Sequence, residues 1–267
     1  MSHAGENPEK QVFAIIPARL SSTRLPGKLL LPLAGKPLIL YTLEQAKKAE
    51  NVSRVIVATD DEQILNVILE NGGEAVLTDK NHQSGSDRIA EVARELPENS
   101  IIVNVQGDEP LISPRTIEKA VAAILKDERV DIATTCEPIS DFRDVLSQNV
   151  VKVVIDENDF ALYFSRSPVP FPREAVKKHY SLENALRNES KLISLFRKHT
   201  GLYVYRREYL LKFTELPQSV LEKAESLEQL RALENGAKIK VVETDETSIG
   251  VDTEEDFERV RLILEKL

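Results

Sequence analysis

The sequence predicts an α/β fold with a mostly parallel central sheet flanked by helices. Short, β-branched apolar runs such as 12–16 and 101–105 have the length and composition of buried strands. Between such runs, apolar residues such as Ile39, Leu43 and Ala46 recur at helical spacing. Strands that alternate with helices are typical of a parallel sheet that is covered on both faces. A chain of 267 residues is long enough to form one such domain with an elaboration.

The first half of the chain follows this alternation regularly. Short apolar runs predict strands at 12–16, 52–58, 74–77, 101–105 and 131–136. Helical spacing and capping residues predict helices around 39–46, over 61–69, from an N-cap at Ser86 through Arg94, and over 113–125.

The alternation breaks near Val150. Runs 151–155 and 160–164 flank the turn-rich tetrapeptide 156–159, which predicts a β-hairpin in an inserted subdomain. The proline-rich and charged segment 167–198 predicts a loop followed by one helix. The remaining elements are predicted as a strand at 201–206, an amphipathic helix over 219–235 with Gly236 as its C-cap, a strand at 238–243 and a closing helix capped by Thr253.

Composition excludes several classes of protein. The formal net charge of -9 is the wrong sign for covering a nucleic-acid backbone, so we expect no nucleic-acid partner. Cys136 is the single cysteine, which rules out an intramolecular disulfide and fits a reducing compartment. Residues 1–10 are polar and predict a flexible extension, and the chain contains no apolar run long enough for a membrane span. We therefore expect a cytoplasmic protein in which 11–267 form one domain.

The loop 17–28, after the first strand, carries Arg19, Arg24 and Lys28 among small residues. Ligands of open α/β sheets bind at the carboxyl ends of strands, and these cations can hold phosphate oxygens. The loop therefore predicts a triphosphate site, although a solvated loop that balances nearby acids would have the same composition. It has neither the phosphate-loop nor the dinucleotide glycine pattern, which disfavours an ATPase and a dehydrogenase.

Two acidic segments are candidates for a magnesium site. The strand at 101–105 is followed by Gln106, Gly107, Asp108 and Glu109, and carboxylates at a strand's carboxyl end can ligate magnesium together with phosphate oxygens. Asp108 is the first predicted ligand, and an ordinary acidic turn is the alternative. Asp252 precedes the closing helix, and this position alone favours helix capping over metal binding.

Seven segments, in this order, resemble the 3-deoxy-manno-octulosonate (Kdo) cytidylyltransferases, also called CMP-Kdo synthetases. The similarity extends over nearly the whole chain from residue 12 onward. The segments are IIPARLSSTRLPGK, HQSGSDR, VNVQGDEP, VVKVVID with ALYFSRSPVPF, KHTGLYVYRREYL, SLEQLRALENG and GVDTEEDFERVR.

The resemblance implies a Rossmann-like nucleotidyltransferase fold and a reaction. Members of the family transfer CMP from CTP to the anomeric hydroxyl of Kdo with the help of Mg²⁺, release pyrophosphate, and so activate the sugar for lipopolysaccharide biosynthesis. The resemblance also implies a homodimer in which the smaller subdomain, 150–206, contributes to dimerisation and sugar binding. Such a reaction builds negative charge around the α-phosphorus, which metal ions and fixed cations can stabilise without a protein nucleophile.

The resemblance further assigns roles to individual residues. Those implied in catalysis are Arg19, Lys28, Asp108 and Asp252, and both carboxylates are implied as metal ligands. Those implied in nucleotide binding are Ala18, Arg19, Ser22, Arg24, Lys28, Ser84, Gly85, Arg88 and Gln106. Those implied in sugar binding are Arg88, Gln106, Arg166, His199, Tyr203, Glu228 and Gln229.

Several alternatives stand beside these assignments. Without the resemblance, Arg88 and Arg166 would each be interpreted as half of a surface ion pair, and His199 as a structural histidine. Cys136 lies in an apolar strand and is expected to be a buried, inert thiol. Rival functions are a cytidylyltransferase for another sugar acid, a hexose-1-phosphate nucleotidyltransferase, and a nucleotide sensor without turnover. The sequence of the first loop disfavours the first two.

Overall fold

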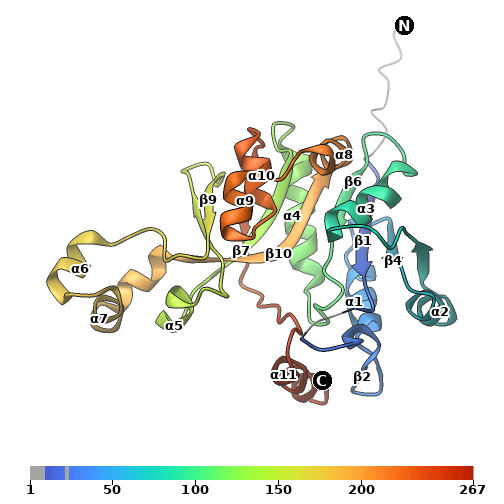
Figure 1. Ribbon diagram of the computed structural model, residues 1–267, viewed down its shortest axis with the longest axis horizontal. Coiled ribbons are helices and arrows are strands. Elements are labelled where there is room, and N and C mark those ends of the chain that lie inside the picture. Colours follow the sequence, from blue (N-terminus) through green and yellow to red (C-terminus); the bar gives the residue numbers. More distant parts are fainter. Residues whose placement is uncertain (1–9, 22–23, 267) are drawn as a thin grey trace, which may run out of the picture.

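A computed structural model describes residues 10–21 and 24–266 (Figure 1). Within these ranges, nine strands form one sheet with the main order β11–β7–β10–β6–β1–β4–β5. The strands on this path are β1 (Val12–Ala18), β4 (Arg54–Thr59), β5 (Glu74–Leu77), β6 (Ile101–Asn104), β7 (Ile132–Pro138), β10 (Arg197–Arg206) and β11 (Ile239–Glu243). The hairpin β8 (Lys152–Ile155) and β9 (Ala161–Ser165) joins the sheet where β8 pairs with β10.

The central strands are mostly parallel, as predicted. β1 lies parallel to both β4 and β6, β4 lies parallel to β5, and β7 lies parallel to β11. β10 is the exception, because it runs antiparallel to both β6 and β7. The carboxyl ends of β1, β4 and β6 therefore meet at one edge of the sheet, the position at which open α/β sheets bind ligands.

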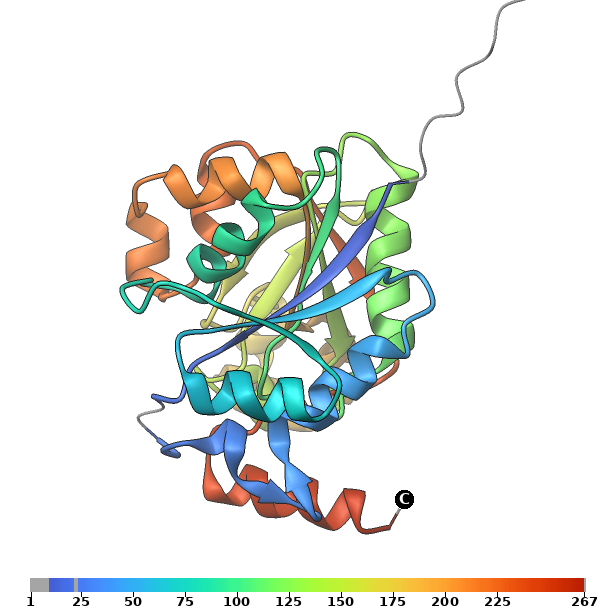
Figure 2. The same cartoon turned by 90° about the vertical axis from the view of Figure 1, so that its right-hand side faces the viewer.

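Helices cover both faces of the sheet (Figure 2). Alternate residues of β1 belong to two different core clusters: Val12, Ala14 and Ile16 pack with one, and Phe13 and Ile15 with the other. The first cluster includes residues of α1 (Leu38–Lys47), α2 (Glu62–Glu70), α4 (Pro114–Lys126) and α11 (Glu254–Leu264). The second includes residues of α3 (Gly85–Arg94), α8 (Arg207–Glu215) and α10 (Gln229–Glu234). Burial on both faces explains why these strands are continuous apolar runs without alternation.

The start of α3 differs from the prediction. Ser84, not Ser86, is the N-cap: its hydroxyl accepts a hydrogen bond from Asp87 N, and the Asp87 carboxylate accepts one from Ser84 N. This reciprocal arrangement is a capping box, which satisfies two backbone donors at once. Ser86 lies inside the helix, where its hydroxyl donates to Glu228 Oε2 over 2.7 Å.

The segment 167–198 holds more helix than predicted. Two helices, α6 (Arg173–His179) and α7 (Leu182–Asn188), are followed by a 3₁₀ helix, η2 (Ser190–Leu195). Tyr180 ends α6 in a left-handed conformation and Ser181 caps α7. Serine is a favoured N-cap, but no sequence signal marks the left-handed conformation of Tyr180. With α5 (Phe142–Leu146), this region builds a small core of its own from Ile139, Val145, Leu186 and Phe196, and α6 and α7 project from the main body (Figure 1).

The predicted helix 219–235 is two helices. α9 (Val220–Glu225) ends at Ser226, whose φ of 53° is incompatible with a continuing helix, and α10 begins at Gln229. Gly236 follows α10 at a φ of 80° and ends it as predicted. The sequence also gave no sign of α8, because the chain enters it directly from β10 without a capping side chain. Among the described residues, no helix has the length and apolar character that crossing a membrane requires.

The turn between α9 and α10 depends on a buried ion pair. Arg231 donates from Nη2 to Glu222 Oε1 over 2.6 Å and from Nε to Oε2 over 2.8 Å, and both residues are buried. We predict that Glu222→Gln lowers the free energy of unfolding by about 3 kcal/mol, because it leaves the guanidinium buried without its counter-charge. Urea denaturation measures this change. Lys223→Gln, at an exposed position of the same helix, is the control, and equal stability of the two variants would contradict the prediction.

Candidate active site

A cleft of about 630 Å³ opens at the carboxyl ends of β1 and β6. It brings together residues that lie far apart in the sequence. Its lining includes Arg19, Arg24, Lys28, Gly85, Gln106, Asp108 and Asp252. The structure therefore gathers the basic loop and both candidate magnesium carboxylates in one place. Ser22, which was also predicted to belong to this site, lies outside the described residues.

The two carboxylates meet at the Lys28 ammonium group. Lys28 Nζ lies 2.5 Å from Asp108 Oδ2 and 2.8 Å from Asp252 Oδ1. Arg24 Nη2 contacts the other oxygen of Asp252 over 2.8 Å. Burial would lower the pKa of Lys28, but the charges and hydrogen bonds of both aspartates outweigh it and raise the pKa above its usual value. The lysine is therefore a cation held by two carboxylates.

The close packing of Gly107 against β1 and α1 determines the position of Asp108. Gly107 follows the strand end, and a Cβ atom at this position would lie 3.0 Å from the carbonyl oxygen of Pro17 and 3.2 Å from Ile39 Cδ1. Thr42 Oγ1 also donates a hydrogen bond to the Gly107 carbonyl over 3.0 Å. A side chain at residue 107 would push this turn away from β1, and Asp108 with it.

Asp252 is placed by the start of α11 but does not cap it. Thr253 is the N-cap, as predicted, and forms a capping box with Asp256. The Asp252 side chain turns to Lys28 and Arg24 in the cleft. The capping role, which position alone favoured for Asp252, therefore belongs to its neighbour.

The donor set of the cleft fits a hard divalent cation. Both carboxylates already contact the same positive group, the Lys28 ammonium. Carboxylate oxygens are also the protein ligands that magnesium prefers. Among the described residues, no cluster of three or more histidine, cysteine or acidic side chains has metal-binding geometry. An ion held by Asp108 and Asp252 would thus need further ligands such as phosphate oxygens and water.

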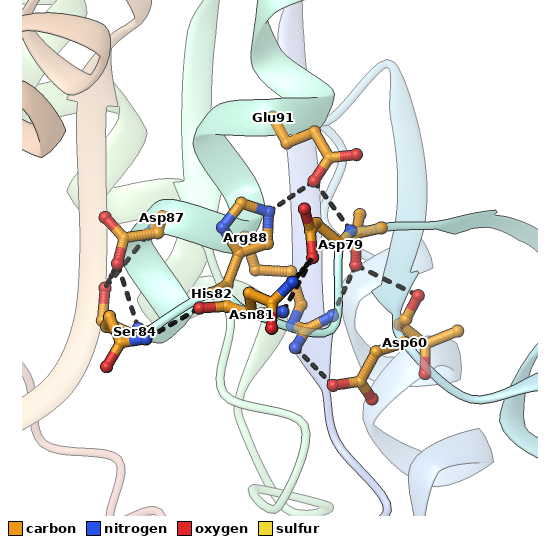
Figure 3. A network of polar contacts seen from close by, with 11 residues as sticks. Asp60, Asp79, Asn81, His82, Ser84, Asp87, Arg88 and Glu91 are labelled. Atoms are coloured by element: carbon orange, nitrogen blue, oxygen red, sulfur yellow. Dashed lines mark hydrogen bonds and ion pairs between the residues drawn. The ribbon is translucent and has the colours of Figure 1, made fainter.

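Arg88 extends from α3 towards Asp60 in a network of polar contacts (Figure 3). Its side chain is fully buried; Nη2 contacts Asp60 Oδ2 over 2.6 Å, and Nη1 donates to the hydroxyl of Thr78. Asp60 directly follows β4 and Thr78 directly follows β5, so the guanidinium joins two strand ends to α3. Arg88 is absent from the cleft lining among the described residues. Arg88 does form an ion pair, with Asp60, but its side chain is buried and does not lie on the surface.

The segment that leads into α3 is held by further polar contacts (Figure 3). Glu91 accepts a hydrogen bond from Asp79 N over 3.0 Å and contacts His82 Nε2. Asp79 in turn accepts from Asn81 N over 2.8 Å. These contacts fix the approach to Gly85, whose backbone lies against Pro17 at the cleft.

The residues expected to bind the sugar surround β10 on the face that carries α3 and α10. His199 and Tyr203 lie on β10 with ring centroids 5.4 Å apart, and Glu228 and the buried Gln229 lie at the start of α10. Gln106 connects this group to the cleft, because its Nε2 donates to the Gly201 carbonyl over 3.3 Å.

Arg166 already has partners in the structure. Its Nε donates to the Glu225 carbonyl over 2.7 Å and its Nη1 to the Gln148 carbonyl over 3.0 Å. These contacts tie the end of β9 to α9, so the side chain is not one half of a surface ion pair. A carboxylate ligand would have to displace one of these carbonyls to be bound bidentately.

The hydrogen bonds of Thr134 define the tautomer of His199. The Thr134 hydroxyl donates its only proton to the Leu202 carbonyl over 2.7 Å. His199 Nε2 lies 2.9 Å from Thr134 Oγ1, so the imidazole must donate the hydrogen bond between these two atoms. Nδ1 is then left as an acceptor. Burial lowers the pKa of His199 to about 3, which keeps the ring neutral at physiological pH.

Glu109 and Ser248 form a contact beside the turn that carries Asp108, but neither lines the cleft among the described residues. Glu109 was predicted only as part of the acidic turn, and Ser248 had no predicted role. Ser248 Oγ donates to Glu109 Oε2 over 3.0 Å. Burial, and after it the charge of Asp108, raises the pKa of Glu109 to about 7. Asp60 was missed in the same way, although its place after a strand is the signal that identified Asp108. Cys136 is buried as predicted, and burial raises the pKa of its thiol to about 12.

We predict that the His199 imidazole stays neutral from pH 8 to pH 5. The pKa of His199 in the folded protein lies below its value in the unfolded chain, so between about pH 6.5 and pH 3 only the unfolded chain binds the proton. The histidine therefore leaves stability unchanged above about pH 6.5 and lowers the free energy of unfolding as pH falls towards 3. His199→Gln should therefore lessen the loss of unfolding free energy between pH 7.5 and 5 by up to about 2 kcal/mol. NMR titration of the ring, assigned by its disappearance in this variant, checks the protonation. A His199 resonance that titrates near 6.5 would refute the prediction.

Comparisons with known proteins agree with this fold and identify the family. The family model described as cytidylyltransferase matches residues 13–239. The chain is 51% identical to the 3-deoxy-manno-octulosonate cytidylyltransferase of Trichlorobacter lovleyi, over 94% of this chain and 97% of that protein. It is 50% identical to the enzyme of the same name from Geobacter sulfurreducens, over 96% of this chain and 99% of that protein.

Among solved structures, the CMP:2-keto-3-deoxy-manno-octonic acid synthetase complexed with CTP is similar to the whole chain. The TM-score is 0.86 at 39% identity, and the match covers 97% of this chain and 100% of that one. A mostly parallel α/β sheet with a basic loop and two carboxylates at its ligand-binding edge is typical of a nucleotide-binding enzyme. The chain belongs to the cytidylyltransferase family, among the 3-deoxy-manno-octulosonate cytidylyltransferases.

Proposed function

We propose that this protein transfers CMP from CTP to the anomeric hydroxyl of Kdo and releases pyrophosphate. The observation that carries the proposal is the cleft in which Asp108, Asp252 and Lys28 meet, in a chain about as long as relatives that carry this enzyme name. The similar structure complexed with CTP supports the nucleotide. The product would then serve lipopolysaccharide biosynthesis.

The residues of the cleft suit the charge changes of the reaction. Attack of a hydroxyl on the α-phosphorus builds negative charge on the phosphate oxygens, and cations already in place stabilise this charge. We propose that Arg19, Arg24 and Lys28 contact the triphosphate and that Asp108 and Asp252 hold Mg²⁺. When bound, the ion would neutralise phosphate charge as a Lewis acid. Gly85, at the start of α3, would contact the nucleotide through its backbone.

The acceptor would bind beside β10. His199, Tyr203, Glu228 and Gln229 supply hydrogen-bonding groups there, and Gln106 lies between them and the cleft. We assign Arg88 an indirect role, because its buried guanidinium already binds Asp60 and Thr78 and can act on a substrate only by positioning α3. The carboxylate of the sugar acid would thus be left to Arg166.

Release of pyrophosphate tests this function directly. We expect release with CTP and Kdo in the presence of Mg²⁺, and none with ATP, with N-acetylneuraminate or without an acceptor. Asp108→Ala and Asp252→Asn should each lower turnover by at least about 100-fold, because each removes a carboxylate that would hold Mg²⁺, whose positive charge stabilises the transition state. Glu255→Gln, at an exposed position near Asp252, is the control. If the protein binds CTP but releases pyrophosphate with none of the acceptors, the proposal is wrong and a nucleotide sensor without turnover is favoured.

We also propose a cytoplasmic homodimer that uses the subdomain 150–206, from which α6 and α7 project (Figure 1). Phe171 and Tyr180 support this interface, because 61% and 94% of their surfaces are exposed on that region. Light scattering should give twice the chain mass of 30.0 kDa, and the double variant Phe171→Ser and Tyr180→Ser should shift it towards the monomer. Leu69→Ser, at an exposed apolar position of α2, is the control. A monomeric native protein would contradict the proposal.

A further inference from the structure

The segment that carries Asp252 has no regular structure of its own. Residues 244–253 connect β11 to α11 without forming a helix or strand. Two hydrogen bonds tie this segment to the turn that carries Asp108. Val251 N donates to the Asp108 carbonyl over 2.9 Å, and Ser248 Oγ donates to Glu109 Oε2 over 3.0 Å. The second bond is the only one of the two that depends on side chains.

The Glu109 carboxylate also touches β10. A Cβ atom at Gly201 would lie 3.3 Å from Glu109 Oε1 and 3.4 Å from Gln106 Cγ, so the glycine leaves just enough room for the carboxylate. Gly201 lies at the irregularity of β10 between His199 and Tyr203. One carboxylate therefore contacts the segments that carry the candidate metal ligands and the strand that carries candidate sugar ligands.

The hydrogen bond from Ser248 to Glu109 restrains the segment that carries Asp252, one of two like charges in the cleft. Lys28 screens the repulsion between Asp108 and Asp252 in the structure. When a ligand draws Lys28 away, a loop without secondary structure can relieve that repulsion by moving away. The bond from Ser248 opposes this movement, because Glu109 is fixed to the rigid end of β6 by the turn that contains Asp108. The loop is thereby held in place before any ion binds.

We propose that Glu109 is a positioning residue that holds Asp252 against Asp108 through Ser248 and so presets the cation site. The proposal rests on the magnesium role of these aspartates in the proposed function. Protein groups that orient metal ligands typically change metal affinity by about 10- to 100-fold when they are removed. The contact should therefore affect cation binding far more than the turnover rate at saturating cation.

The primary test is Ser248→Ala, with two matched variants. Ser248→Thr keeps the hydroxyl, and Thr247→Ala removes a neighbouring, exposed hydroxyl from the same loop. Two quantities are measured: the Mg²⁺ concentration that gives half-maximal turnover, and the affinity for Mg²⁺ by calorimetry with CTP present and acceptor absent. We expect Ser248→Ala to weaken both by about 10- to 100-fold, with kcat at saturating Mg²⁺ within about twofold of wild type. The two matched variants should stay close to wild type.

A double-mutant cycle with Glu109→Ala identifies the partner. In the Glu109→Ala background, Ser248→Ala should cause no further loss of Mg²⁺ affinity, because the bond is already gone. Unchanged Mg²⁺ affinity in Ser248→Ala, or losses that multiply in the double variant, would overturn the proposal. If Glu109→Ala does not fold, the comparison of Ser248→Ala with Ser248→Thr still decides.

The calorimetric measurement separates this proposal from the function on which it rests. A wild-type protein that binds Mg²⁺ with CTP but does not use Kdo would refute the proposed acceptor and leave the positioning role testable. A wild-type protein that binds no Mg²⁺ with CTP would overturn the positioning role as well.

Discussion

The site depends on one electrostatic constraint: Asp108 and Asp252 lie close together at the end of a hydrophobic sheet and need a cation between them. Lys28 provides that cation in the structure, with contacts of 2.5 Å and 2.8 Å. Its pKa is raised, so the charge persists at physiological pH. A ligand that brings its own cation competes with Lys28 for these carboxylates, and Lys28 is then free to contact phosphate oxygens.

The fold supplies the framework for this arrangement. β1 and β6 are adjacent parallel strands, so the basic loop after β1 and the acidic turn after β6 emerge at the same edge. Gly107 allows the two turns to approach closely, and the capping box of α11 fixes the helix that follows Asp252. On the other side, the buried Arg88 links the ends of β4 and β5 to α3, which carries Gly85 into the cleft. The walls of the cleft are thus held by a close backbone approach, a helix capping box and a buried ion pair.

The sequence predicted the sheet, most strands and the basic loop because these follow from apolar runs and local charge. It failed where a single backbone conformation decides the outcome: the φ of 53° at Ser226 divides one apparent helix into two, and Tyr180 separates α6 from α7. Tertiary partners were equally hidden. Periodicity could not show that Arg88 is buried against Asp60, that Ser248 reaches Glu109, or that the Asp252 side chain turns to Lys28 and Arg24. For Asp252, only the family resemblance pointed to the cleft.

We propose that Asp108 and Asp252 together bind the cation that accompanies CTP. Anomalous diffraction from crystals grown with CTP and Mn²⁺, a substitute for Mg²⁺, locates this cation. We expect a manganese peak in contact with both carboxylates, with the triphosphate against the loop that carries Arg19 and with Lys28 Nζ moved from the aspartates to phosphate oxygen. A peak that touches neither aspartate, or CTP bound outside this cleft, would show that the two carboxylates do not form the cation site.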